Sequence, residues 1–119
     1  MQQKLLNCET PALMRERASL FYLAVHESAG EISGLGGLDL NEIRLMCVSP
    51  NHRREGIGRA LITYFETLVP PDFFKDIFVY AAPGAVAFYR HLGFEARGES
   101  RFDIEGLPLV TIFMTRLLR

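Results

Sequence analysis

Arginines and glycines that could bind an anion stand together in SPNHRREGIGRALI, residues 49–62. Arg53, Gly56 and Gly58 form the pattern Arg-x-x-Gly-x-Gly where a helical pattern begins. The first turn of a helix has unpaired amides and about half a positive charge, so it favours a pyrophosphate. Glycine has no Cβ that would hold the phosphates away. The stretch alone indicates either an anion site or a tight turn followed by a solvated loop.

Two other phosphate-binding motifs are excluded. A dinucleotide fingerprint needs a third glycine three residues after the second, and that position is Leu61. A P-loop needs Gly-Lys-Ser/Thr, which the sequence does not contain. Arg54 and Arg59 could flank an anion bound at the remaining pattern.

The composition predicts one soluble domain over residues 1–119. The chain is 49% hydrophobic and 23% charged, which is ordinary for a globular protein and excludes disorder. The formal net charge of −1 gives no indication of a nucleic-acid partner. No apolar run approaches the roughly 20 residues that a membrane helix needs.

The cysteines and the first residues predict a cytoplasmic location. Cys8 and Cys47 form neither a metal-binding spacing nor a disulfide framework, so we expect free thiols in a reducing cytosol. The beginning, MQQKLLNCE, lacks the cationic flank and apolar stretch of a signal peptide. No metal site is expected.

Hydrophobic periodicity predicts an α/β protein with a mixed sheet. The middle of the chain, from 42 to 82, reads as strand, helix and strand, which should form a parallel, right-handed crossover. Pro70 and Pro71 end the first long helix, and Gly93 caps the second. The expected elements are strand 4–8, helix 11–17, strands 19–27, 32–40 and 42–48, a helix from 57, strand 76–82, a helix from 83, and a hairpin of 95–103 and 108–117.

Three side-chain faces follow from the same patterns. Ile43, Leu45 and Cys47 should share one face of their strand, opposite Glu42. In the first long helix the expected buried residues are Ile57, Leu61, Tyr64, Phe65 and Leu68. In the second they are Ala85, Val86, Phe88, Tyr89 and Leu92.

Two separated blocks of sequence, IRLMCVSPNHRREGIGRALI and AVAFYRHLGF, resemble the GNAT superfamily of acyl-CoA-dependent N-acyltransferases. The first block matches that family's Gln/Arg-x-x-Gly-x-Gly/Ala motif, preceded by Val48-Ser49-Pro50. The second matches its Phe-Tyr-x-x-x-Gly-Phe helix end, here Phe88-Tyr89 and Gly93-Phe94. The resemblance covers residues 19 to 117, and it predicts the GNAT-like fold for this chain.

The resemblance implies acetyl-CoA as the cosubstrate. It implies that backbone amides in the stretch from Arg54 to Arg59 bind the pyrophosphate, and that the edge of the strand at Met46, Cys47 and Val48 pairs with the pantetheine arm. The amide of Val48 would then act as an oxyanion donor to the thioester. The predicted cofactor-binding residues are Met46, Cys47, Val48, Arg53, Arg54, Glu55, Gly56, Ile57, Gly58 and Arg59.

The resemblance also implies two catalytic residues. Tyr89 matches the tyrosine that meets the CoA sulfur, although a core tyrosine would fit the same helix. Proton transfer from a phenol of pKa about 10 to a thiolate of pKa about 8.5 is uphill by roughly 2 kcal/mol. Tyr89 therefore needs a lowered pKa or acts mainly by a hydrogen bond. Glu42 matches a position that supplies the base in some members, through water, and a solvated glutamate is the alternative.

The remaining titratable residues are expected to be structural. His52 lies in the loop, where it could touch phosphate, but neither it nor His91 has a visible partner, so we expect both to be surface residues. We expect Cys47 to be part of the core rather than an acyl-carrying nucleophile.

The chain departs from the family at two places. Ala82 stands where the family often has an asparagine that bonds the pantetheine arm, and few residues precede the first long strand. The acceptor side should therefore be open, completed by a second subunit in a homodimer or suited to a large substrate. We predict an N-acetyltransferase that acts on a primary amine of a small molecule or protein by direct attack in a ternary complex. The alternative is a non-catalytic acyl-CoA-binding module that works through a protein partner.

Overall fold

The computed structural model describes residues 22–52 and 55–118. Its contacts divide the chain into two compact units, residues 1–70 and 71–119. A single domain over the whole chain and the parallel crossover between the two units stay predictions, and the elements expected before residue 19 lie outside the described residues.

The first unit contains three antiparallel strands, β1 (Tyr22–Ser28), β2 (Glu31–Asp39) and β3 (Glu42–Val48). They pair in chain order, β1 with β2 and β2 with β3. Ala29 and Gly30 both have positive φ, 52° and 82°, as the tight turn between β1 and β2 requires. The strands predicted around 32–40 and 42–48 are thus confirmed.

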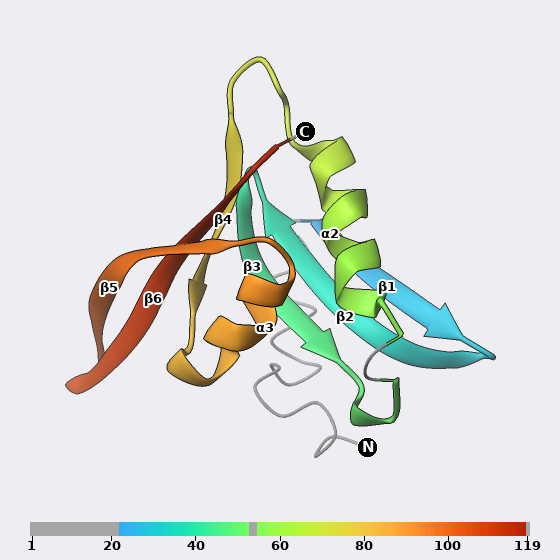
Figure 1. Cartoon of the computed structure of the whole chain (residues 1–119). Helices are drawn as coiled ribbons and strands as arrows, with labels where there is room; N and C mark the ends of the chain where they lie inside the picture. The colour runs from blue at the N-terminus through green and yellow to red at the C-terminus, as the bar shows by residue number, and fades with distance from the viewer. Residues whose placement is uncertain (1–21, 53–54, 119) are drawn as a thin grey trace. The chain divides into compact units, whose positions relative to one another are not determined.

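One helix, α2 (Ile57–Leu68), lies against this sheet (Figure 1). Two strand glycines allow it to come close. A Cβ at Gly34 would lie 2.5 Å from Cγ2 of Ile57, and one at Gly36 would lie 2.8 Å from Cε2 of Phe65. The glycines of β2 therefore serve the packing of α2.

Alternation along the strands explains which side chains of this unit are buried. Ile43, Leu45 and Cys47 are 3%, 7% and 6% exposed, so their predicted common face is confirmed. In α2 the expected buried face is confirmed at Ile57, Leu61 and Phe65. Tyr64 is an exception, because its side chain is 51% exposed. Ile62, which we did not assign to the buried face, is buried.

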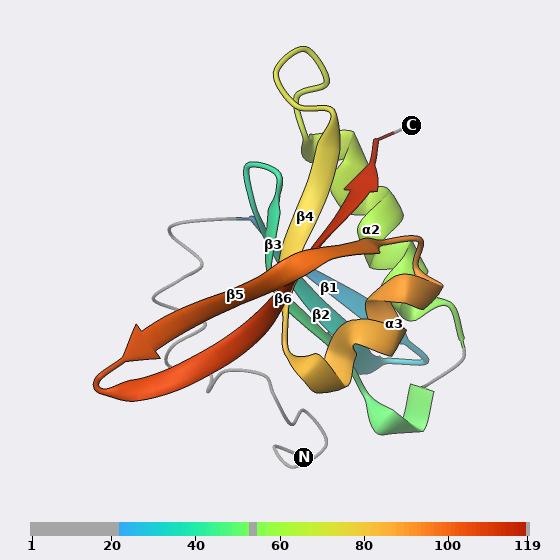
Figure 2. The same ribbon diagram turned by 60° about the vertical axis from the view of Figure 1, so that its left-hand side comes forward.

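The second unit contains a β4-β6-β5 sheet and two short helices (Figure 2). Strand β6 pairs antiparallel with both neighbours. Glu105 and Gly106, with φ of 51° and 80°, make the tight turn of the predicted β5–β6 hairpin. The elements are β4 (Asp76–Ala81), η3 (Pro83–Ala85), α3 (Val86–His91), β5 (Glu95–Ile104) and β6 (Leu107–Leu117).

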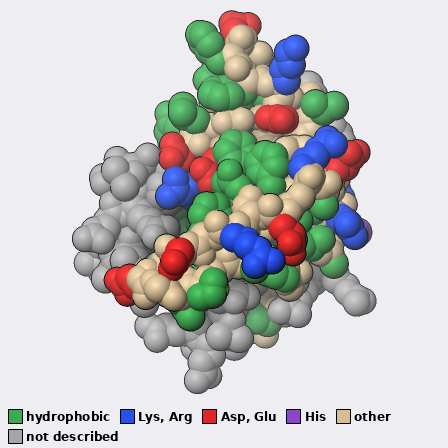
Figure 3. Space-filling view, turned by 90° about the vertical axis from the view of Figure 1, so that its left-hand side faces the viewer, with side chains coloured by type: hydrophobic (Ala, Val, Ile, Leu, Met, Phe, Trp, Pro, Cys, Tyr) green, Lys and Arg blue, Asp and Glu red, His purple; other side chains and the backbone are tan. Residues whose placement is uncertain are grey.

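The two faces of this second sheet differ in composition. Ile77, Val79 and Met114, on one face, are at most 4% exposed. The other face has an aromatic cluster in which each ring centroid lies 5.3–5.8 Å from a neighbour's: Phe78, Tyr80, Phe102 and Phe113. Tyr80 and Phe102 stay 39% and 42% exposed. Figure 3, drawn from the side of Figure 1 where β5 and β6 lie, shows hydrophobic side chains gathered between acidic and basic groups.

Candidate active site

The backbone of β3 presents hydrogen-bonding groups at the edge that faces away from β2. The amide of Ser49 donates to the carbonyl of Ser33 at 2.8 Å, so residues 33 and 49 form a hydrogen-bonded pair. Hydrogen-bonded and non-bonded pairs alternate in an antiparallel ladder. Gly34 pairs with Val48 and Gly36 with Met46, and both are therefore non-bonded pairs. The amides of Met46 and Val48 consequently point away from β2.

The turn that follows β3 leads into the first turn of α2. Pro50–His52 form a short 3-10 helix, η2, and Gly56 has left-handed geometry with φ of 75°. A Cβ at Gly56 would meet no atom within 4 Å, so the space above the turn is open. Ala60 donates the first backbone bond of α2, to Gly56 at 2.9 Å.

The described part of this turn fits a bound pyrophosphate. The amides of Ile57 and Gly58 precede the first intrahelical hydrogen bond, as amides of a first helical turn do. The N-cap is a glycine and supplies no side-chain acceptor for them. Arg53 and Arg54, which complete the predicted motif, lie outside the described residues.

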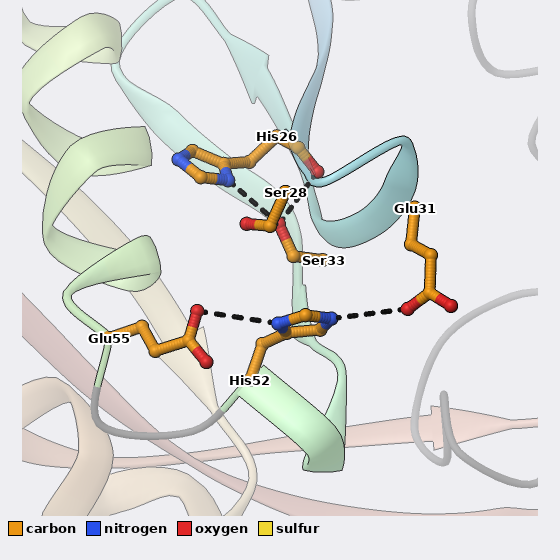
Figure 4. Close-up of polar contacts among 6 residues, drawn as sticks. All are labelled: His26, Ser28, Glu31, Ser33, His52 and Glu55. Carbon is orange, nitrogen blue, oxygen red and sulfur yellow. Dashed lines mark hydrogen bonds and ion pairs between the residues drawn. The ribbon is translucent and has the colours of Figure 1, made fainter.

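His52 was wrongly predicted to be a surface residue without a partner. Its side chain is 15% exposed and lies between two carboxylates (Figure 4). Its Nε2 lies 3.5 Å from Oε2 of Glu31, and its Nδ1 lies 3.3 Å from Oε1 of Glu55. Glu31 is 21 residues away in the sequence, so spacing gave no signal of this contact. His91, by contrast, is exposed as expected.

A buried serine next to this turn also escaped prediction. Ser33 is 0% exposed, and its hydroxyl donates to the carbonyl of His26 at 2.9 Å. The same oxygen accepts a bond from the Ser28 hydroxyl at 3.0 Å and lies 2.7 Å from Nδ1 of His26 (Figure 4). Because its carbonyl also binds Ser49, Ser33 connects β1 and β2 with the end of β3. The only sign of this buried residue in the sequence was that a serine stood among apolar strand residues.

Glu42 stands at the other end of β3. Desolvation raises the pKa of its carboxyl, and Asp39 adds to this rise, whereas Arg44 opposes it. The Nη1 atom of Arg44 lies 3.7 Å from Oε1 of Glu42 and 3.2 Å from Oδ2 of Asp39. Six residues of extended strand separate Glu42 from Val48, a span of about 20 Å. Glu42 can therefore exchange a proton with a group near Val48 only through water.

Tyr89 lies in the second unit, on α3, and is held by the turn that ends this helix. Gly93 has φ of 93°, which confirms the predicted left-handed cap. The cap brings the amide of Phe94 to the carbonyl of Tyr89 at 3.0 Å, and the two rings pack edge to face with centroids 5.5 Å apart. Tyr89 is 6% exposed, but Phe88, which we expected on the same buried face, is 37% exposed.

The phenol of Tyr89 is a poor acid in this environment. Desolvation by burial raises its pKa well above the usual range for tyrosine. Of the two roles that the sequence left open, the structure therefore favours a neutral hydrogen-bond donor over a proton donor with a lowered pKa.

Cys47 is a buried residue of the first unit and is not a free thiol. It packs with Leu35 and Leu45, as we expected of a core residue. It is disulfide-bonded, which corrects the expectation of free thiols. Cys8, the other cysteine of the chain, lies outside the described residues.

Two further findings concern the described ranges, 22–52 and 55–118. They contain no group of three His, Cys, Asp or Glu side chains placed to hold a metal ion. No helix within them has the length and apolar character needed to cross a membrane.

The fold and the site define a class of protein: an α/β chain whose strand edge leads into a glycine turn at a helix start. Comparison with known proteins gives the class its name. The family model for the acetyltransferase (GNAT) domain matches residues 4–116, so the chain belongs to the GNAT acetyltransferase family. The family resemblance that the sequence indicated is thereby confirmed.

Individual relatives agree with this assignment. N-acetyltransferase 8 of Rattus norvegicus is 30% identical in an alignment 108 residues long, which covers 80% of this chain and 48% of that protein. The chain thus spans about half the length of this relative. A GCN5-related N-acetyltransferase of Rhodopseudomonas palustris superposes with a TM-score of 0.78 at 24% identity, over 90% of this chain and 68% of that one.

A third similar protein is a GNAT family acetyltransferase of Elizabethkingia anophelis with acetyl-CoA bound. Its TM-score is 0.70 at 19% identity, over 98% of this chain and 90% of that one. The structural similarities confirm the predicted GNAT-like α/β fold. None of the three proteins supports the alternative of a non-catalytic binding module.

Proposed function

We propose that the protein transfers an acetyl group from acetyl-CoA to a primary amine by direct attack in a ternary complex. One observation carries the proposal: the Val48 amide points away from β2 on a strand that leads directly to the glycine turn of α2. Membership of the GNAT family supports acetyl-CoA as the acetyl donor, and so does the acetyl-CoA bound to the Elizabethkingia protein.

In this proposal the backbone of the first unit binds the donor. The edge of β3 at Met46, Cys47 and Val48 pairs with the pantetheine arm, and the Val48 amide stabilises the oxyanion that forms when the amine attacks. Backbone amides of residues 53–59, with the Arg53, Arg54 and Arg59 side chains beside them, hold the pyrophosphate. No metal ion is needed in this scheme.

Two side chains complete the chemistry. The neutral amine attacks the thioester carbon, the carbon–sulfur bond breaks, and the sulfur leaves as a thiolate. The Tyr89 phenol stabilises this thiolate by a hydrogen bond. Glu42 receives the proton of the amine through water, a role that its raised pKa supports. The acceptor, a homodimer and a cytoplasmic location stay predictions from the sequence.

Binding of acetyl-CoA and transfer to a panel of amines, measured by CoA release, test this function. We expect acetyl-CoA to raise the melting temperature of the wild type and Gly58→Val to abolish the shift, because a side chain would enter the space of the phosphates. Gly98→Ala is the control, since a Cβ there meets no atom within 4 Å. If acetyl-CoA raised the melting temperature of Gly58→Val as much as that of the wild type, the proposed phosphate site would be wrong. A wild type that binds acetyl-CoA but releases CoA no faster than a reaction without the protein, with every amine of the panel, would overturn the proposed enzymatic function.

A further inference from the structure

The turn before α2 contains an apparent conflict of charges. Glu55 directly precedes Gly56, in the stretch that we propose to hold a pyrophosphate. A carboxylate repels a neighbouring anion, and two exposed like charges side by side cost up to about 1 kcal/mol. The structure shows how the conflict can be resolved, because Nδ1 of His52 lies 3.3 Å from Oε1 of Glu55.

His52 is held in place for this contact by the backbone. Its amide donates to the carbonyl of Ser49 at 2.9 Å, and the Ser49 amide donates to the carbonyl of the fully buried Ser33. The ring is thus connected through the backbone to β2. Glu31, at the start of β2, meets the opposite ring nitrogen at 3.5 Å.

Both ring nitrogens of His52 are placed against carboxylates, Nε2 against Glu31 and Nδ1 against Glu55. A neutral imidazole has one N–H donor, whereas a protonated one has two. Both ring nitrogens of His52 face carboxylate oxygens, which only accept hydrogen bonds. Protonated His52 can therefore satisfy both acidic residues, and its positive charge compensates the charge of Glu55.

We propose that His52 is a positioning residue of the donor site: it neutralises Glu55 and turns its carboxylate away from the pyrophosphate of acetyl-CoA. This inference rests on the proposed function. Glu31 holds the ring in the required orientation from β2. His52 does not touch the reacting atoms, so its effect belongs to donor affinity and not to the chemical step.

A double-mutant cycle tests the proposal by isothermal titration with CoA. His52→Ala should weaken binding about fivefold, the effect of one uncompensated exposed charge. Glu55→Gln should bind at least as tightly as wild type, and the double variant should return close to wild type, because no carboxylate is left to neutralise. His52→Arg, which keeps a positive charge, should retain most of the affinity. Glu99→Gln, an exposed acid on β5, is the control and should bind as wild type does.

Two readouts separate this role from a merely structural one. With acetyl-CoA, His52→Ala should raise KM about fivefold and leave kcat unchanged. With acetyl-pantetheine, which lacks the pyrophosphate, neither should change.

The outcomes are distinct. If adding Glu55→Gln to His52→Ala does not restore the affinity for CoA, His52 acts only on the stability of the turn and the inference is wrong. The same conclusion follows if His52→Ala raises KM for acetyl-pantetheine as much as it raises KM for acetyl-CoA. If His52→Ala binds CoA as wild type does, the inference fails while the proposed function stands. If the wild type binds no CoA, both fail.

Discussion

Tyr89 shows how burial selects among the chemical roles of one residue. A phenol removed from water resists ionisation, so the raised pKa of Tyr89 makes it a weak acid but leaves it protonated at every physiological pH. In the reaction proposed above, such a neutral donor would give the departing thiolate a charge-assisted hydrogen bond, which is worth about 1.5–3 kcal/mol. The contribution arises only as the sulfur gains charge.

Tyr89→Phe is therefore expected to lower kcat between about tenfold and a hundredfold and to leave KM for acetyl-CoA unchanged. The wild-type rate should show no loss at alkaline pH from ionisation of this tyrosine up to pH about 10. Steady-state kinetics across pH measures both effects. Tyr80→Phe, on an exposed tyrosine of the same unit, is the matched control. Equal kcat in Tyr89→Phe and wild type would leave Tyr89 as a core residue only.

In its proposed role as the base, Glu42 would act through its protonation state, and the direction of its pKa shift sets the expected pH profile. A base must be deprotonated, and desolvation raises the pKa of Glu42. The rate should therefore fall as the pH decreases through the raised pKa of Glu42, which lies above that of an ordinary glutamate. This acidic fall of the pH–rate profile should disappear in Glu42→Gln. Glu27→Gln, an exposed acid on β1, should keep the wild-type profile. An acid limb that persists in Glu42→Gln would assign it to another group.

The acceptor sets how large the effect of Glu42 can be. A lysine amine, with a pKa of about 10.4, costs near 4.6 kcal/mol to deprotonate at pH 7, and an α-amine costs only about 1 kcal/mol. Glu42→Gln should consequently slow transfer to lysine-type amines more than transfer to α-amines. Competition between the two acceptor classes in one reaction, followed by mass spectrometry, measures the ratio.

Residues also mark the limit of prediction from the sequence. The family motifs predict Gly56, Gly58 and Tyr89 as site residues, because these residues stand at fixed spacings within the motifs. No such spacing relates His52 to Glu31, since a turn and a strand meet only after folding. The exposure of Tyr64 and Phe88 was missed for a related reason. Periodicity predicts the side of the helix on which a residue lies, but not whether another element packs against that residue.

At the scale of elements, the packing of α2 on β2 depends on two glycines of the strand. Gly34 and Gly36 lie at alternate positions, so both face the helix. A methyl group at either would overlap Ile57 or Phe65, and overpacking of this kind costs about 1–3 kcal/mol. The element boundaries themselves were largely predictable, because turns at Gly30 and Gly106 and the prolines after α2 interrupt clear periodicities.

Gly34→Ala and Gly36→Ala should each lower the free energy of unfolding by about 1–3 kcal/mol. Gly98→Ala lies in a strand as well, but its Cβ would meet nothing within 4 Å, so it should be close to neutral. Urea denaturation of the three variants measures the difference. Equal stability of all three would mean that α2 does not pack on β2 as closely as described.

Strand β5 is an edge of the second sheet, and its sequence protects that edge. Within the described ranges it pairs only with β6, and its charges alternate in sign at Glu95, Arg97, Glu99, Arg101 and Asp103. Charged side chains on an edge strand oppose pairing with other chains. Replacing Glu99 and Arg101 together by valine keeps the net charge but should promote aggregation, as light scattering at rising protein concentration would show. The exchanged pair Glu99→Arg with Arg101→Glu should remain dispersed, and aggregation of the exchanged pair as well would argue against a role for charge.

At the scale of the whole molecule, the question is whether the two compact units unfold together. The sequence predicts a single domain, while the contacts divide the chain near residue 70. A ligand at one hundred times its Kd stabilises the folded state by about 2.7 kcal/mol. For a chain of 119 residues, with about 2.1 cal/mol/K of unfolding entropy per residue, this corresponds to about 10 °C in Tm. If the chain is one cooperative domain, calorimetry should show a single transition, with equal calorimetric and van't Hoff enthalpies, that acetyl-CoA moves as a whole by about that amount. Two transitions, of which acetyl-CoA moves only one, would show that the units are separate domains and that one of them alone binds the donor.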